Sequence, residues 1–254
     1  MKLFVPALFF FITYPGFSQT NNGDTTIQTV LISFSYSPSN FPPDWQSAPI
    51  NAKGEGIYRS EIVRSKLVMS KALKKYPLLV LQKTLRAVYF LKEMTFYNVG
   101  YGGTNSTDAL YLTNNGEPSG YTEQYLEQTF HHEYSSIFFR NYSSFFDEAA
   151  WKKAIITGFD YNDPEAGVGA IRNNQSSQDL DTALCAKGFL TQYSLSGMEN
   201  DINTVAQNIF CPSENFWNYA DRYPLINKKV KLLISFYHKI DPVFTESYFR
   251  KLSH

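Results

Sequence analysis

The chain has 254 residues and carries 23 Lys and Arg against 23 Asp and Glu, so its formal net charge at pH 7 is zero. This balance argues against a nucleic-acid partner, because proteins that bind nucleic acid present a basic surface. Aromatic residues, mostly Phe and Tyr, make up 17% of the chain. Two uses for them remain open, core packing and the lining of a peptide or glycan cleft.

The first 18 residues have the pattern of a secretion signal. Lys2 precedes an apolar run, and Gly16 and Ser18 stand three residues and one residue before the expected cleavage point. The mature chain would then begin at Gln19, and we expect a secreted or periplasmic protein. No later segment has the roughly 18 consecutive apolar residues of a membrane span. Residues 19–254 suffice for one substantial core, so we expect a single domain, with two lobes as an option.

The N-terminal third of the mature chain predicts one strand and two helices. Alternating apolar residues indicate a strand over 26–36, and a Pro- and Ser-rich loop follows over 37–56. A helix is expected over 59–75, and a second one runs from Pro77 to about residue 85, because proline suits the first turn of a helix.

Strands are expected next, over 87–93, 95–101 and 108–113. The glycine-rich segment 100–103 marks a turn or bulge before the last of these strands. The strand expected over 108–113 is followed by the breaker sequence 114–118 and then by a helix that carries the main motif of the chain.

Residues 130–137 read Phe-His-His-Glu-Tyr-Ser-Ser-Ile. They match the helical zinc-peptidase motif H-E-x-x-H at His132 and Glu133, with Ser136 in the place of the second histidine. In the intact motif both imidazoles lie on one helix face and bind one ion, while the glutamate polarises the metal-bound water. A neutral hydroxyl is a poor zinc ligand, so the motif leaves metal binding open.

The neighbouring His131 does not replace the missing ligand, since consecutive helical residues point about 100° apart. An alternative interpretation of the two histidines is a pair of partly buried, hydrogen-bonded residues. One side of the helix is apolar and is expected to face the core, whereas a polar strip is expected to line a cleft. The apolar side comprises Leu126, Phe130, Tyr134, Ile137 and Phe138, and the polar strip comprises Thr129, His132, Glu133 and Ser136.

A second motif, Tyr-Ser-Leu-Ser-Gly-Met-Glu-Asn-Asp over 193–201, opens another apolar-periodic run. With both motifs the chain resembles the gluzincins, zinc peptidases whose third ligand is a glutamate on a later helix. It looks most like the secreted or lipoprotein metallopeptidase type associated with substrate import in bacteria, over about residues 84–210. The resemblance implies a zinc cofactor held by His132 and Glu199 beside Ser136, with Glu133 as general base and Tyr193 as oxyanion stabiliser.

Glu199 has a second interpretation that needs no metal. Ser196 stands three residues before it, and this spacing is typical of a capping box, in which the two side chains satisfy free backbone N–H groups at a helix start. No cysteine follows the expected cleavage point, so the lipid anchor of the resembling proteins is not expected here.

Cys185 and Cys211 bracket the expected helix of Glu199. In an oxidising compartment an even pair of cysteines predicts one disulfide, and two free buried thiols are the alternative.

Further helices are expected over 145–156, 226–237 and 242–252, and a polar loop over 158–181. The expected architecture is α+β, a small twisted sheet with packed helices that carry the site, and the resemblance implies that it is zincin-like. Three functions remain open. The first is zinc-dependent hydrolysis of a peptide or protein substrate, the second is a non-catalytic protein that binds peptides or a partner, and the third is an enzyme with a weak metal site of His132, Glu199 and waters.

Overall fold

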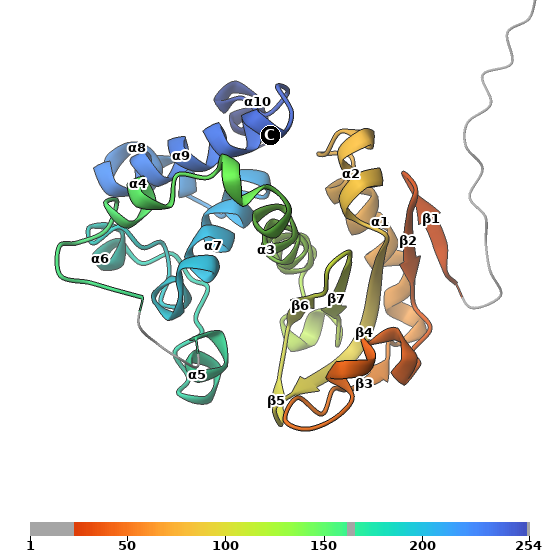
Figure 1. Ribbon diagram of the computed structural model, residues 1–254. Helices are drawn as coiled ribbons and strands as arrows, with labels where there is room; N and C mark the ends of the chain where they lie inside the picture. The colour runs from red at the N-terminus through yellow and green to blue at the C-terminus, as the bar shows by residue number, and fades with distance from the viewer. Residues whose placement is uncertain (1–22, 162–165, 253–254) are drawn as a thin grey trace, which may run out of the picture.

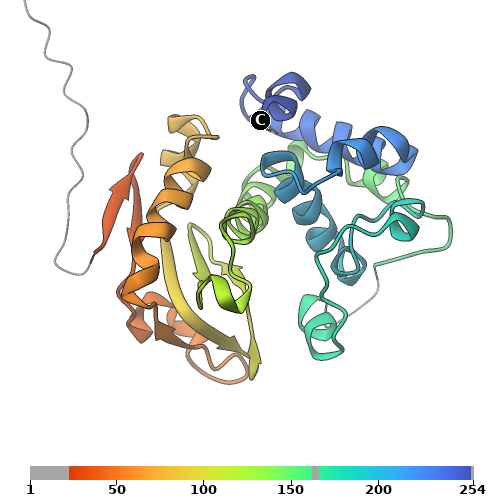
Figure 2. The ribbon, with the colours of Figure 1, turned by 180° about the vertical axis from the view of Figure 1, so that it is seen from behind.

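The computed structural model describes residues 23–161 and 166–252, so the leader expected over 1–18 lies outside the described residues. Strands dominate the first half of the chain and helices the second, which confirms the α+β class. Helix α3 (Glu123–Tyr142) lies between the sheet and the C-terminal helices (Figures 1 and 2). None of the described helices is both long and apolar enough to cross a membrane.

Within the described residues, seven strands form one mixed sheet around the long strand β4. β2 and β7 run parallel to the first half of β4, whereas β3 and β5 pair with its second half in antiparallel orientation. β1 and β6 are the two ends of the order β1-β2-β4-β7-β6. The strands are β1 Thr25–Ile27, β2 Val30–Ser33, β3 Lys53–Gly56, β4 Ala87–Phe96, β5 Val99–Gly100, β6 Gly103–Asn105 and β7 Ala109–Thr113.

The single strand expected over 26–36 is wrong, because the segment is a hairpin. Gln28 and Thr29 both have positive φ, 48° and 75°, and they turn the chain between β1 and β2. Two successive residues with positive φ match the twist of antiparallel strands. Gln and Thr are unusual in this conformation, so the composition of the segment gives no sign of the turn.

β4 likewise replaces two expected strands, because it continues to Phe96 and the chain turns only at Tyr97 and Asn98. The short strands β3 and β6 were not expected. β6 contains Gly103, which lies in the segment 100–103 expected to form a turn or bulge.

The helices expected over 59–75, from Pro77 and over 226–237 are confirmed with shifted ends. The helix expected over 145–156 is much shorter, because only α4 (Glu148–Lys152) forms there. The loop expected over 158–181 contains the helix α5 (Ala166–Arg172). The remaining helices are α1 Ile62–Leu73, α2 Leu78–Thr84, α4 Glu148–Lys152, α5 Ala166–Arg172, α6 Thr182–Cys185, α7 Met198–Phe210, α8 Phe216–Arg222, α9 Pro224–Ile240 and α10 Glu246–Lys251.

Alternate residues of the central strands pack into two different hydrophobic clusters. In β7, Leu110 and Leu112 join the main cluster with α1 and α3, whereas Ala109 and Tyr111 join a smaller one beneath the loop that contains Phe41. The apolar side of α3 packs into the main cluster, and its five expected core residues are fully buried. This packing turns the polar strip of α3 away from the core.

A buried ion pair anchors α7. Asp201 and Lys229 are both 0% exposed, and their charged groups lie 2.5 Å apart. The same carboxylate oxygen of Asp201 accepts hydrogen bonds from the Trp151 indole at 2.9 Å and the Tyr161 hydroxyl at 2.6 Å. Lys229 also donates to the Gly188 carbonyl. Asp201 therefore ties α7 to α4, α9 and the chain between α4 and α7.

The disulfide predicted between Cys185 and Cys211 is wrong, because both are free buried thiols. Gly188 bonds to the Cys185 carbonyl and to Lys229, which places Cys185 near the first turn of α7. Cys211 directly follows the last residue of this helix. A helix of 13 residues is about 20 Å long, whereas a disulfide needs Cα atoms within about 7 Å.

We predict that Lys229→Met lowers the free energy of unfolding by about 3–5 kcal/mol, because it leaves a buried carboxylate without its cation. Lys152→Met is the matched control, since Lys152 pairs with Glu148 on the surface, where such a pair contributes about 0–1 kcal/mol. Urea denaturation of both variants measures the difference. Equal losses in the two variants would show that α7 does not depend on the buried pair.

Candidate functional site

A cavity of about 550 Å³ lies between β6, α3, α5 and the start of α7. A second cavity of about 250 Å³ adjoins it and shares His132, Glu133 and Tyr193. The first cavity brings together all the site residues expected from the sequence, which are His132, Glu133, Ser136, Tyr193 and Glu199.

Helices α3 and α7 meet in an antiparallel arrangement through three polar contacts, which we call the ladder. Each contact is four residues from the next on both helices, because residues i and i+4 lie on one helix face. The contacts are His132 Nδ1 with Gln207 Oε1 at 2.8 Å, Asn203 Nδ2 with Ser136 Oγ at 2.8 Å, and Arg140 Nη1 with Glu199 Oε1 at 3.6 Å.

The ladder determines which residue of α7 faces Ser136, and it is Asn203. Glu199 lies one helical turn further along and is 47% exposed beside Arg140. Gln207, the partner of His132, is eight residues from Glu199, which corresponds to about 12 Å along the helix axis. The structure thus places Glu199 in the same cavity as His132 but against a different part of α3.

The residues around His132 do not fit a zinc ion. Zinc sites in proteins use three or four ligands from imidazole, thiolate and carboxylate. Here Ser136 and Asn203 are neutral and are bonded to each other. Within residues 23–161 and 166–252, no group of three or more His, Cys, Asp and Glu side chains is placed to hold a metal ion.

His132 is a neutral imidazole with one free nitrogen. Burial lowers its pKa to about 4, against the opposing effect of the Gln207 hydrogen bond. Because the Gln207 carbonyl accepts, Nδ1 carries the proton and Nε2 keeps its lone pair. His131 instead lies fully buried, bonded to the Tyr76 hydroxyl at 2.8 Å and stacked on Phe210, as in the interpretation of two hydrogen-bonded histidines.

Glu133 lies against β6, and this contact requires a glycine in the strand. A Cβ atom on Gly103 would come within 2.8 Å of Glu133 Oε1 and 2.6 Å of Thr129 Cγ2. Asn105, also in β6, donates to Glu133 Oε2 at 2.6 Å. Burial raises the pKa of Glu133 to about 7, and repulsion from Glu199 adds to the rise.

Tyr193 belongs to a short 3₁₀ helix, Tyr193–Ser196, and its ring lies 5.8 Å from that of His132. Burial raises its pKa, so its hydroxyl stays protonated at neutral pH. The capping box, the second interpretation of Ser196 and Glu199, is wrong, because the N-cap residue of α7 is Gly197 and no side chain caps the helix. Ser196 donates instead to the Tyr193 carbonyl at 2.7 Å.

Three functional residues did not stand out in the sequence, Asn105, Asn203 and Gln207, and they hold the three residues of the H-E-x-x-S motif. The spacing of Glu199, Asn203 and Gln207 was a usable signal. Polar residues at i, i+4 and i+8 share one helix face, so they indicate a polar strip on α7 that needs a partner.

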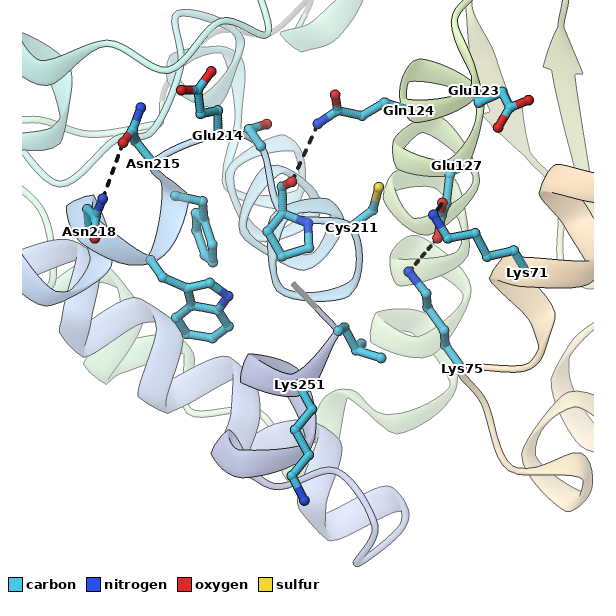
Figure 3. Close-up of a pocket in the computed structure, with 15 residues that line it drawn as sticks. Lys71, Lys75, Glu123, Gln124, Glu127, Cys211, Glu214, Asn215, Asn218 and Lys251 are labelled. Atoms are coloured by element: carbon cyan, nitrogen blue, oxygen red, sulfur yellow. Dashed lines mark hydrogen bonds and ion pairs between the residues drawn. The ribbon is translucent and has the colours of Figure 1, made fainter. Parts of the chain in front are cut away.

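A larger cavity of about 700 Å³ lies at the first turns of α3 (Figure 3). Its buried carboxylate, Glu127, is already paired with Lys75 and with Lys71. Since this carboxylate is already satisfied by two lysines, the cavity around His132 is the better candidate site.

No family model and no curated protein matches this sequence. Among solved structures, the chain is similar to the crystal structure of a "putative zinc-binding metallo-peptidase" from Bacteroides caccae. The sequence identity is 15%, the TM-score is 0.47, and the match covers 73% of this chain and 74% of that one. We draw no functional conclusion from a likeness of this degree.

The ladder predicts how a zinc site can be built here. Ser136→His combined with Asn203→Glu supplies an imidazole and a carboxylate facing each other beside His132, so the double variant should bind zinc. Ser136→His alone should bind much more weakly. Competition with a chromophoric chelator measures the affinity.

Adding Glu199→Gln to Ser136→His is the control for the alternative ligand. If Glu199 were the third ligand, this change would remove the zinc affinity of the single variant. Equal zinc affinities of the Ser136→His protein and of the Ser136→His, Asn203→Glu protein would contradict the assignment of Asn203.

The raised pKa of Glu133 predicts a dependence of stability on pH. A carboxyl whose folded pKa is about 7 and whose unfolded value is near 4.5 contributes stability below pH 4.5 that is lost as the pH rises to 7. Glu133→Gln should remove this loss. Urea denaturation at pH 4.5 and pH 7.5 checks it, and the same pH dependence in parent and variant would exclude the shift.

Proposed function

We propose that the protein binds an extended peptide in the cavity beside β6 and does not hydrolyse it. The observation that carries this proposal is the free edge of β6 along the cavity that contains His132 and Glu133. The secretion signal expected over 1–18 supports a role in peptide capture outside the cytoplasm.

β6 ends the sheet and, among the described residues, pairs only with β7. Hydrogen bonds from Thr113 to the Gly102 carbonyl and from Ser106 to the Ala109 carbonyl show which residues face β7. Backbone groups alternate along an antiparallel strand, so those of Gly103 and Asn105 point to the free edge. An extended peptide adds to such an edge as a further strand.

Binding without hydrolysis is supported by the residues that surround His132. Peptide hydrolysis by zinc needs an ion that polarises the carbonyl and activates water. Ser136 and Asn203 stand where charged or imidazole ligands would be required, and they bond to each other instead.

Hydrolysis is the second candidate, and the raised pKa of Glu133 favours it. A carboxyl with a pKa of about 7 suits a general base at neutral pH. Glu133 would then accept a proton from the attacking water, and the protonated Tyr193 would donate to the oxyanion.

One experiment separates the two candidates. We expect the purified protein to bind members of an unstructured peptide library and to leave them intact in mass spectra, with Glu133→Gln equally inactive. Cleavage by the parent protein that falls by roughly 10²–10⁴-fold in Glu133→Gln would favour hydrolysis.

Backbone methylation of a bound peptide tests the contact with β6. N-methylation of alternate residues should weaken binding in one register and leave it nearly unchanged in the other, because only every second N–H of the peptide faces β6. Side chains stay the same in both peptides, so each is the control for the other. Equal effects in both registers would exclude strand addition.

A further inference from the structure

The wall of the cavity holds three hydrogen-bond acceptors without partners among the described residues. His132 Nε2 keeps its lone pair because Nδ1 is bonded to Gln207. Asn203 Oδ1 is buried and unpartnered, whereas Nδ2 of the same amide is bonded to Ser136. Glu133 uses Oε2 for Asn105, which leaves Oε1.

The three residues that carry these acceptors line one cavity. His132 and Ser136 are one helical turn apart on α3, Asn203 is bonded to Ser136, and Glu133 lines the same cavity. Asn203 is only 2% exposed. A buried amide oxygen without a donor costs about 1–3 kcal/mol, so a bound N–H group at this place would be strongly favoured.

Three side-chain N–H donors beside the cavity are already bonded within the protein, whereas the backbone N–H groups of Gly103 and Asn105 stay on the free edge of β6. Lys152 pairs with Glu148, Asn200 donates to Ser196, and Arg140 donates to Asn105. Of the two exposed carboxylates of the cavity wall, Glu199 is paired with Arg140, and Asp160 adds negative charge. The cavity thus offers acceptors and negative charge, which disfavours an anionic ligand.

We propose that the space between His132, Asn203 and Glu133 receives a primary ammonium group of the bound peptide. An ammonium has three N–H donors, one for each acceptor, and it carries the charge that the carboxylates favour. Zinc would need further imidazole, thiolate or carboxylate ligands at this place, whereas an ammonium needs only hydrogen-bond acceptors. The inference rests on the proposed peptide binding and names the group that the site recognises.

Four forms of one peptide without other basic residues test the inference and its source. The first has a free N-terminus, the second is N-acetylated, the third is N-acetylated with one internal Lys, and the fourth has norleucine in place of that Lys. We expect the first form to bind about ten- to one-hundredfold more tightly than the second, as for hydrogen bonds to a charged group. Restored binding of the third form relative to the fourth would assign the ammonium to a lysine side chain.

Two variants add an independent measurement. Asn203→Asp should strengthen binding of the amine-bearing peptide and leave the acetylated peptide unchanged, because it places a carboxylate at the ammonium. Asn200→Asp adds the same charge elsewhere on the cavity wall and should have a smaller effect.

Equal affinities of all four peptides would overturn the ammonium site but leave peptide binding intact. Equal effects of the two Asp variants would also overturn it, since general attraction would then suffice. If no form binds, the proposed peptide-binding function itself fails.

Discussion

The buried pair of Asp201 and Lys229 fixes the position of α7, and the position of α7 decides which side chains face α3. Burying two charges costs several kcal/mol per ion unless hydrogen bonds satisfy them. Gly188 accepts from Lys229, and Trp151 and Tyr161 donate to Asp201 only when Asp201 stands at its observed place. A shift of α7 by one turn would break the ion pair and both hydrogen bonds to Asp201, so core electrostatics sets the register of the ladder.

The sequence was a good guide to the long helices and a poor one to the sheet. The apolar side of α3 is legible because its residues repeat at helical spacing and all of them enter one core. The edges of the sheet depend on positive φ at Gln28, Thr29, Tyr97 and Asn98, which local composition does not specify. β6 was hidden for a related reason, because its glycine serves a close approach to Glu133 rather than a turn.

The candidate site likewise has a part that the sequence predicts and a part that it does not. His132, Glu133 and Ser136 belong to one helix, so their relation follows from helical geometry alone. The partner of Ser136 lies on another helix, and the choice between Glu199 and Asn203 depends on the register of two elements about 70 residues apart. No local pattern contains this register. The distance between Cys185 and Cys211 could not be predicted from the sequence either, because it depends on how the α6 segment packs along α7.

The one-to-one pairing along the ladder constrains how the two helices can evolve. Ser136 contacts Asn203, and His132 contacts Gln207, so a replacement on α3 changes the selection acting on one particular residue of α7. In homologous chains these positions should therefore change together, and a histidine at 136 should accompany an acidic residue at 203. A lineage that loses one member of such a pair releases the other from selection, and the original pair would become hard to restore by single substitutions.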